Sequence, residues 1–242
     1  RIFFVIFFIF FSTNQLLSLE KFNKAGKIAD YFSGILLLNE EKYDESFKYL
    51  RKLDGLENIH KTYSTKYLYT LINSGNFYQA LIFSKKLEKE KESFFESNLI
   101  IGIYYLKNSK FNLSREYFLK AKRTKPKLIL DNYVIDSLIN WSNLENIDLD
   151  ESMIFLNQMD SRFVNLKKIQ KVFLNCYYKS SDTTQSFKEL ISDKRIDFSR
   201  YNSFLSKYLN RIGQKEEAEL LLNNSIKKHP RNLLLKQLKL DQ

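Results

Sequence analysis

The sequence predicts an all-α fold, an α-solenoid built from tandem antiparallel helix pairs. The first observation behind this prediction is a repeat of about 34 residues, a period typical of solenoids made from two helices and a turn. An aromatic residue follows this period at Tyr43, Phe77 and Phe111, and a small residue follows it at Ser46, Ala80 and Ser114. The second observation is composition. With 2 Pro, 6 Gly and 44% hydrophobic residues, the chain is expected to be ordered and mainly helical.

We expect about six helix pairs, each a helix A followed by a helix B, and a short C-terminal capping helix. The expected pairs are 27–39 with 43–54, 61–73 with 77–90, 95–107 with 111–122, 128–141 with 151–159, 163–178 with 183–191, and 198–211 with 215–228. A final helix over 232–240 would cover the open end of the array. Asn and Gly in the turns after helix A, as in Asn73-Ser-Gly-Asn76, are typical helix stops.

The net charge of +11 allows two interpretations. A basic chain is suited to nucleic acid or to an anionic membrane surface. However, Glu is interleaved with Lys, as in the segment 85–92, and no long block of Lys and Arg occurs. We therefore favour an ordinary solvated surface and expect nucleic acid not to be the partner.

The residue types that carry chemistry are sparse. A single cysteine, Cys176, excludes an intramolecular disulfide and a cysteine-based zinc site. Its apolar neighbours predict a buried structural thiol rather than a nucleophile. His60 and His229 lie near expected helix ends, where surface or capping roles are the simplest explanation.

Enzyme motifs are also missing from the sequence. It contains no Gly-rich phosphate loop, no pair of catalytic carboxylates, no H-E-x-x-H and no G-x-S-x-G. The acidic stretch 146–151 lacks the Gly and the spacing of a calcium loop, so helix N-capping explains it better. We expect no catalytic residues, no metal site and no cofactor.

Residues 1–12 are one basic residue followed by an apolar run, Ile2 to Phe11. This pattern predicts a secretory signal peptide, because the run is shorter than the ~20 residues that span a membrane. No A-x-A cleavage site follows, so an uncleaved membrane anchor stays open. No cysteine follows the run, which excludes a lipoprotein. The sequence starts without Met, and we expect it to be part of a longer chain.

The repeat resembles the tetratricopeptide repeat (TPR) family, of the type that bacteria export. The best match is 98–126, where Gly102 takes the place of the helix A glycine and Pro126 the place of the closing proline. The first two pairs match less fully, the last pair matches again over 201–230, and the middle pairs carry almost none of the pattern. The repeat-defining positions are Gly34, Tyr43, Ser46, Gly75, Phe77, Ala80, Gly102, Tyr105, Phe111, Ser114, Phe118, Ala121, Pro126, Gly213, Ala218 and Pro230.

The physical meaning of these positions is close helix approach. Small residues let helices A and B touch, and we expect the aromatic residues to fill the space between successive pairs. The resemblance implies a right-handed superhelix with a concave face lined by helix A. In this register the predicted groove consists of Tyr31, Ile35, Leu38, Thr65, Tyr69, Ile72, Leu99, Ile103 and Leu106, with Asn39, Asn73 and Lys107 at its edge.

The predicted groove is apolar and aromatic. Chaperone-binding TPR proteins clamp a terminal carboxylate with Lys and Asn, and these residues do not line the groove here. A hydrophobic partner segment or helix suits it better. The alternative is that the Leu and Ile members simply pack against neighbouring helices.

We therefore predict a non-enzymatic protein–protein interaction scaffold, periplasmic or anchored on the outer side of the inner membrane, that acts in cell-envelope assembly or organisation. Its expected segments are 1–19 as signal peptide or anchor, 20–126 as three regular units, and 127–242 as degenerate units that end in one recognisable unit and a cap. One alternative is an RNA-binding, pentatricopeptide-like protein. Another is a structural subunit of a membrane-anchored complex. The identity of the partner and the oligomeric state are not encoded in any motif.

Overall fold

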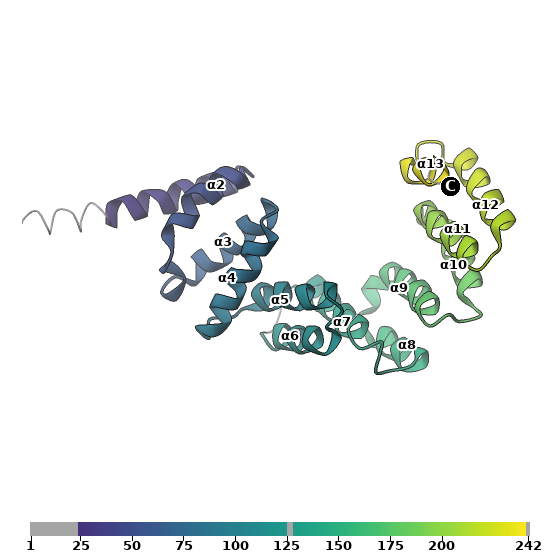
Figure 1. Ribbon diagram of the computed structural model, residues 1–242, viewed down its shortest axis with the longest axis horizontal. Coiled ribbons are helices and arrows are strands. Elements are labelled where there is room, and N and C mark those ends of the chain that lie inside the picture. The colour runs from purple at the N-terminus through teal and green to yellow at the C-terminus, as the bar shows by residue number, and fades with distance from the viewer. Residues whose placement is uncertain (1–23, 125–127, 241–242) are drawn as a thin grey trace, which may run out of the picture. The chain divides into compact units, whose positions relative to one another are not determined.

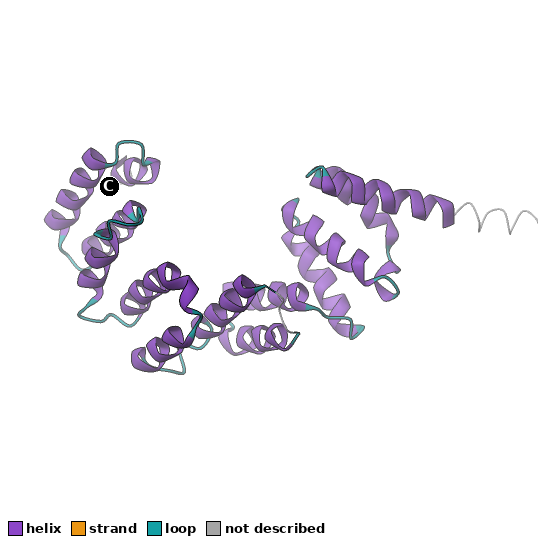
Figure 2. Cartoon of the chain, turned by 180° about the vertical axis from the view of Figure 1, so that it is seen from behind, coloured by secondary structure: helices purple, strands orange, loops and turns teal. Residues whose placement is uncertain are grey.

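The computed structural model describes residues 24–124 and 128–240, and every regular element within these ranges is a helix (Figure 2). Consecutive helices pack against each other in pairs, which confirms the predicted all-α solenoid. The chain divides into two compact units, Arg1–Leu128 and Ile129–Gln242, and each is described here by itself. The apolar segment 1–12, predicted as a signal or anchor, lies outside the described residues.

Unit 1 contains three helix pairs (Figure 1). The first described helix covers 24–39. It is followed by α2 (Tyr43–Leu50), the 3-10 turns η1 (Arg51–Leu53) and η2 (Leu56–Asn58), α3 (Lys61–Asn73), α4 (Phe77–Lys89), α5 (Phe95–Lys107) and α6 (Phe111–Arg123). These bounds match the expected pairs to within one residue except at the first helix, which already includes 24–26, and at α2. The helix expected over 43–54 ends at Leu50, and the chain then turns through Gly55, whose φ of 91° is left-handed.

Unit 2 contains three further pairs and a last helix. They are α7 (Ile129–Trp141), α8 (Leu149–Gln158), η3 (Ser161–Phe163), α9 (Val164–Tyr177), α10 (Thr183–Ile191), η4 (Ser199–Tyr201), α11 (Asn202–Arg211), α12 (Lys215–Lys228) and α13 (Leu233–Leu240). Helix α8 starts before the expected residue 151, because the Asp148 carboxylate accepts the Glu151 N–H at 2.8 Å and caps the helix. The acidic stretch is therefore a helix cap, as predicted.

One residue in the turn between helices A and B is left-handed in most pairs. The positions are Glu41, Gly75, Ser109, Lys179 and Gly213. In each case the following N–H donates to the carbonyl five residues earlier, at 2.8–2.9 Å, which is the hydrogen bond of a Schellman motif. Gly75 and Gly213 thus serve as the expected helix stops. The other three residues are Glu41, Ser109 and Lys179. For a residue other than glycine, this backbone conformation costs roughly 1–2 kcal/mol.

Helices A and B in unit 1 meet at a glycine and a serine. A Cβ atom added to Gly102 would lie 2.4 Å from the ring of Phe118, and one added to Gly34 would lie 2.5 Å from Leu50 Cδ2. The Ser114 hydroxyl donates to the Gly102 carbonyl at 2.9 Å, and Ser46 donates to Gly34 at 2.8 Å. The predicted close approach of helices A and B is therefore confirmed at Gly34 and Gly102. The middle pair, with Leu68 and Ala80, has no such hydrogen bond.

Unit 2 makes the equivalent contact with polar pairs instead of glycine. Asn140 on α7 accepts from the Ser152 hydroxyl at 3.0 Å and donates to the Ser152 carbonyl at 3.2 Å. Asn175 on α9 donates to the Ser186 hydroxyl at 2.7 Å. All four residues are buried. These pairs define the repeat register in the region where the sequence pattern was lost.

The other repeat-defining residues divide into core and surface. Ser46, Ala80, Ser114, Phe118, Ala121 and Ala218 are fully buried, whereas Tyr43, Tyr105 and Phe111 are half-buried and Pro230 is exposed. Phe77 corrects the expectation that the aromatic series fills the space between pairs. It is the first residue of α4 and is 63% exposed. Pro126 is outside the described residues.

Candidate functional site

The predicted groove of unit 1 contains side chains of very different accessibility. Tyr69 is 50% exposed and Ile103 is 42% exposed, and these two are the large apolar members that solvent reaches most easily. Thr65, Asn39, Asn73 and Lys107 are also exposed. Tyr31, Ile35, Ile72, Leu99 and Leu106 are half-buried. A partner could contact the exposed members without any change in the fold.

Leu38 does not fit the predicted groove. It is only 5% exposed and belongs to the core of unit 1, so its side chain is not available to a partner. Ile35 and Ile72 pack partly against the buried clusters around Leu50 and Leu71. The packing explanation therefore accounts for Leu38 and for part of the surface of these two residues. The physical reason is that a helix face has no sharp border between its groove side and its core side.

Tyr69 is held in place by its neighbours. Its ring lies edge-on to the ring of Tyr43, with centroids 6.1 Å apart. The Asn73 side chain donates to the Tyr69 carbonyl at 2.8 Å. Tyr43 comes from the start of α2, the helix that precedes α3, so the contact joins two successive pairs. An ordered aromatic side chain that remains half exposed loses little conformational entropy when it binds a partner.

An apolar pocket lies at the start of unit 1 and includes one predicted groove residue. Its volume is about 540 Å³, and Tyr31 contributes one wall, with its ring 5.3 Å from the ring of His60. His60 itself caps α3, because its Nδ1 accepts the Tyr63 N–H at 3.0 Å. The sequence interpretation missed the exposed lining residues Ile28, Phe32 and Ile59. The spacing of four between Ile28 and Phe32, which puts them on one helix face, could have identified them.

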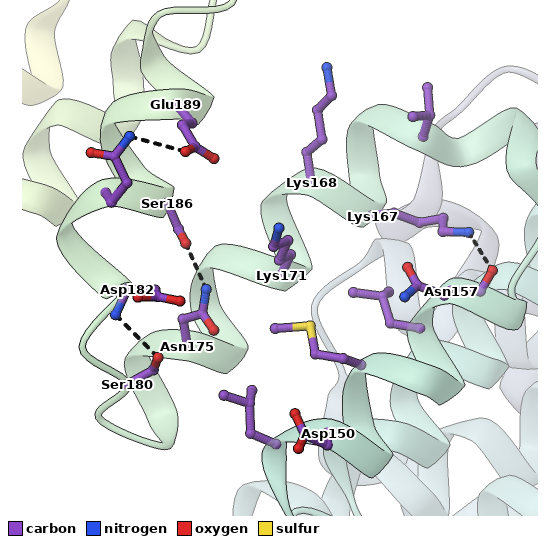
Figure 3. A pocket seen from close by; sticks show the side chains of 15 residues that line it. Asp150, Asn157, Lys167, Lys168, Lys171, Asn175, Ser180, Asp182, Ser186 and Glu189 are labelled. Atoms are coloured by element: carbon purple, nitrogen blue, oxygen red, sulfur yellow. Dashed lines mark hydrogen bonds between the residues drawn. The ribbon is translucent and has the colours of Figure 1, made fainter.

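A second pocket lies in unit 2 among α8, α9 and α10 (Figure 3). Its volume is about 680 Å³. One wall is largely apolar and is formed by α8, with Met153 and Leu156. The opposite wall is polar and is formed by α10, with Gln185 and Glu189. No sequence signal pointed to this pocket, because its lining comes from the pairs in which the repeat pattern is absent.

Three lysines from α9 line this pocket, and two of them already have partners. Lys167 donates to the carbonyls of Asn157 and Met159, both at 2.9 Å. It thereby provides a hydrogen-bond donor for carbonyls at the C-terminal end of α8. Lys168 forms an ion pair with Asp193. Lys171 is exposed and forms no ion pair within the described chain; Figure 3 shows it between the two walls. The pocket therefore offers one uncommitted cation.

The pocket coincides with a gap in a series of bridges between successive B helices. In unit 1, Glu88 on α4 accepts from Tyr117 at 2.8 Å and from Lys120 at 3.0 Å, both on α6. In unit 2, Lys188 on α10 pairs with Glu217 on α12 at 3.0 Å. Among the described residues, no hydrogen bond or ion pair joins α8 to α10. These two helices stand apart, which leaves room for the pocket.

Two observations describe the metal-binding and thiol chemistry of the described residues. Within 24–124 and 128–240, no group of three or more His, Cys, Asp and Glu side chains could hold a metal ion. Burial raises the pKa of the half-buried Cys176 thiol, which disfavours the reactive thiolate. The two pockets offer apolar contact in unit 1 and mixed polar and apolar contact in unit 2. No helix in the described ranges is both long enough and apolar enough to cross a bilayer.

The chain matches no protein-family model and no curated protein. Among solved structures, it is similar to a chain of the APC/C hetero-tetramer Cut9–Hcn1, with a TM-score of 0.53 and 12% identity over 88% of this chain and 42% of that chain. A chain in the structure of Naa15/Naa10 bound to HypK-THB matches with a TM-score of 0.31 and 11% identity, over 88% of this chain and 38% of that chain.

The present chain thus spans less than half the length of these matched chains. At 12% identity, the similarity to the Cut9–Hcn1 structure shows the fold alone, which is a TPR-like array of helical repeats. Folds of this kind present extended surfaces to other proteins.

Proposed function

We propose that this protein is a non-enzymatic interaction scaffold that binds an apolar segment of a partner protein along the helix A side of unit 1. The observation that carries the proposal is the exposure of Tyr69 and Ile103, which occupy equivalent positions of α3 and α5, the A helices of two successive pairs. Apolar side chains at a constant spacing suit a partner that offers several anchors in a row. The pocket beside Tyr31 would accept one further apolar side chain.

Exposed Tyr and Ile alone do not define a binding face, because single exposed apolar residues are common on protein surfaces. The proposal therefore needs a matched control on another face. Tyr78 on α4 serves this purpose, since it is also a tyrosine and is 74% exposed, more than Tyr69. If exposure alone caused binding, Tyr78 would be the better contact.

Site-specific photo-crosslinking in cells tests the proposal. A photoreactive phenylalanine analogue is placed at position 69, 103 or 78 of the full chain. We expect the same partner to be crosslinked from 69 and 103, with little or no product from 78. Equal products from all three positions, or a product from 78 alone, would contradict the proposed face. Circular dichroism of each variant controls for folding.

A second experiment asks whether the contacts are needed. The double substitution Tyr69→Ala and Ile103→Ala removes both exposed apolar side chains and should weaken capture of the crosslinked partner about tenfold or more, given about 1–3 kcal/mol for each buried apolar anchor. Tyr78→Ala should leave capture unchanged. Unaltered capture by a folded double variant would count against the groove.

We further propose that the protein is exported from a bacterial cytoplasm and acts in cell-envelope assembly or organisation. Support comes from the basic residue and apolar run of residues 1–12. Cell fractionation with protease protection, together with mass spectrometry of the mature N-terminus, tests this. Protein outside the cytoplasm that is cut near 12–19 supports export, an intact N-terminus in the membrane supports an anchor, and soluble cytoplasmic protein contradicts both.

A further inference from the structure

Helix α11 and the turn η4 before it carry a row of basic side chains on one face. The row consists of Arg200, Lys207 and Arg211, spaced by seven and four residues. At 3.6 residues per turn, Lys207 and Arg211 on α11 lie about 40° apart around the helix axis, and Arg200 lies in the 3-10 turn that leads into the same helix. We call this row the basic stripe. All three side chains are exposed.

No acidic side chain neutralises the basic stripe. Within the described chain, none of its three residues forms an ion pair, and the Arg200 guanidinium lies 5.8 Å from the centroid of the neighbouring Tyr201 ring. The segment from Ser199 to Arg211 contains no Asp or Glu, and neither does α9 beside it. Helix α12, which also packs against α11, carries Glu216, Glu217 and Glu219, and Glu217 is paired with Lys188. The preceding acid, Asp197, accepts the Ser199 N–H at 2.8 Å. In contrast, Lys168 and Lys188 in the same unit are paired with carboxylates.

An aromatic side chain lies within the stripe. Phe204 falls between Arg200 and Lys207 on the same helix face, and it is 39% exposed. Its ring contacts Phe173 of α9, with centroids 5.2 Å apart, and Tyr201, at 5.8 Å. Two aromatic neighbours therefore hold the Phe204 ring, and part of it remains exposed to solvent. The stripe offers three cations around one apolar contact.

We propose that the basic stripe binds an acidic segment of a partner protein, with side-chain carboxylates on the three cations and an apolar side chain on Phe204. The inference rests on the scaffold function proposed above but uses separate residues in the other unit. The stripe is about 16 Å long at 1.5 Å per residue. An extended segment of about five or six residues covers that length. Arginine is suited to the contact because its guanidinium binds a carboxylate through two parallel hydrogen bonds.

The dimensions distinguish this ligand from other anions. A single terminal carboxylate is too small to reach three cations spread over about 16 Å, so at least two side-chain carboxylates are needed. A nucleic acid requires cations that follow its backbone along a longer path. The exposed lysines of the adjacent α12, Lys215, Lys227 and Lys228, share that helix with Glu216, Glu217 and Glu219. Helix α7 in the same unit brings Asp131 and Asp136, so acidic side chains interrupt a longer path of cations. A short acidic protein segment fits best.

The test uses the full chain and a matched charge control. The stripe variant carries Arg200→Gln, Lys207→Gln and Arg211→Gln. The control variant carries Lys215→Gln, Lys227→Gln and Lys228→Gln, three exposed lysines at the ends of the adjacent helix α12. Both variants lose the same net charge. Circular dichroism and urea unfolding establish that both are folded.

The probe is a fluorescent peptide in which Glu residues flank one Phe, with an amidated C-terminus. Its affinity is compared with that of the same peptide with Gln in place of Glu, and with that of a single-stranded oligouridylate. We expect the acidic peptide to bind and the Gln peptide to bind much more weakly. The stripe variant should lose about tenfold in affinity, because it removes three surface ion pairs. The control variant should bind as the wild type does, and binding should weaken with salt.

Several outcomes would overturn the inference. Equal loss in both variants would mean that net charge alone attracts the peptide. Binding that requires a free C-terminal carboxylate would indicate terminal recognition. Stronger binding of the oligouridylate, lost in the stripe variant, would indicate a nucleic-acid surface. Absence of peptide binding at low salt would also reject the proposal.

The crosslink from position 69 separates this inference from the proposed function. If that crosslink forms in a chain that does not bind the acidic peptide, the stripe inference fails and the scaffold proposal stands. If the peptide binds through the stripe and no crosslink forms from 69 or 103, the groove proposal fails and the stripe stands.

Discussion

Units 1 and 2 solve the same packing problem with different chemistry. In the first and third pairs of unit 1, helix A approaches helix B through a glycine, and the partner side chain, Leu50 or Phe118, fills the space where a Cβ would be. In unit 2, the same position holds Asn140 or Asn175, which hydrogen-bonds to a buried serine. The comparison shows that the repeat requires a close and satisfied helix contact and not a particular residue. A small residue or a polar pair provides it equally well.

The difference predicts that the two units respond to substitution by different mechanisms. Substitution of the glycine destabilises the contact by steric overlap, because the added side-chain atom is forced against the neighbouring helix. A polar pair fails when one member is removed and the other is left buried without a partner. The following predictions test this distinction, beginning with the largest expected effect.

Gly102→Ala should be strongly destabilising. The new Cβ would lie 2.4 Å from the Phe118 ring, which is fully buried. We expect a loss of about 3 kcal/mol in the free energy of unfolding, measured with urea. Gly34→Ala should cost less, because it meets the end of a leucine side chain. The second substitution Phe118→Leu should recover part of the Gly102→Ala loss, and no recovery would contradict the steric explanation.

Asn140→Ala should destabilise unit 2 by about 2 kcal/mol, because it leaves the buried Ser152 hydroxyl without its acceptor. Ser152→Ala alone should also destabilise. The double variant should be less destabilised than the sum of the two single variants, since it leaves no partner behind. Additive losses in this double-mutant cycle would show that the two side chains do not act as a pair.

Substitutions at the left-handed turn residues should change the stability of the fold by a smaller amount. Replacing a glycine there should destabilise the fold, and introducing a glycine at an equivalent position should stabilise it. Gly213→Ala should cost about 1 kcal/mol, because φ of 86° is unfavourable for alanine. Lys179→Gly, at φ of 54°, should stabilise the same unit by up to about 1 kcal/mol, reduced by the greater freedom of glycine in the unfolded chain. Thermal unfolding followed by circular dichroism would detect both changes, and a shift of the same sign would contradict the assignment.

The smallest predicted effect depends on pH. The hydrogen bond from Lys168, with the backbone N–H of Arg195, lowers the pKa of Asp193 to about 2. Because the pKa in the folded state is below the unfolded value of about 4, the stabilisation is present above pH 4 and is lost as pH falls towards 2. Asp193→Asn should remove this part of the acid dependence of unfolding. An unchanged acid profile in the variant would show that the pair contributes nothing measurable.

The sequence by itself determined the helices and their pairing in unit 1. Periodic apolar residues, a small residue at Ser46, Ala80 and Ser114, and Asn and Gly at the turns all act locally, within one or two helical turns. The bounds of α3, α5, α10 and α12 therefore agree with the prediction. The same local signals failed at α2, where the chain turns at Gly55, and at α8, whose capping aspartate lies outside the apolar pattern.

What only the tertiary structure decided is which side chains face solvent and which residues replace glycine. Leu38 and Ile103 are both apolar residues of the predicted groove, yet one is buried and the other is exposed, because burial depends on neighbours from other helices. The pairs Asn140–Ser152 and Asn175–Ser186 form between residues more than ten apart, and no local pattern marks them. The basic stripe likewise becomes apparent only once the cations with partners are distinguished from those without. Local propensity fixes an element, but accessibility and pairing are properties of the packed chain.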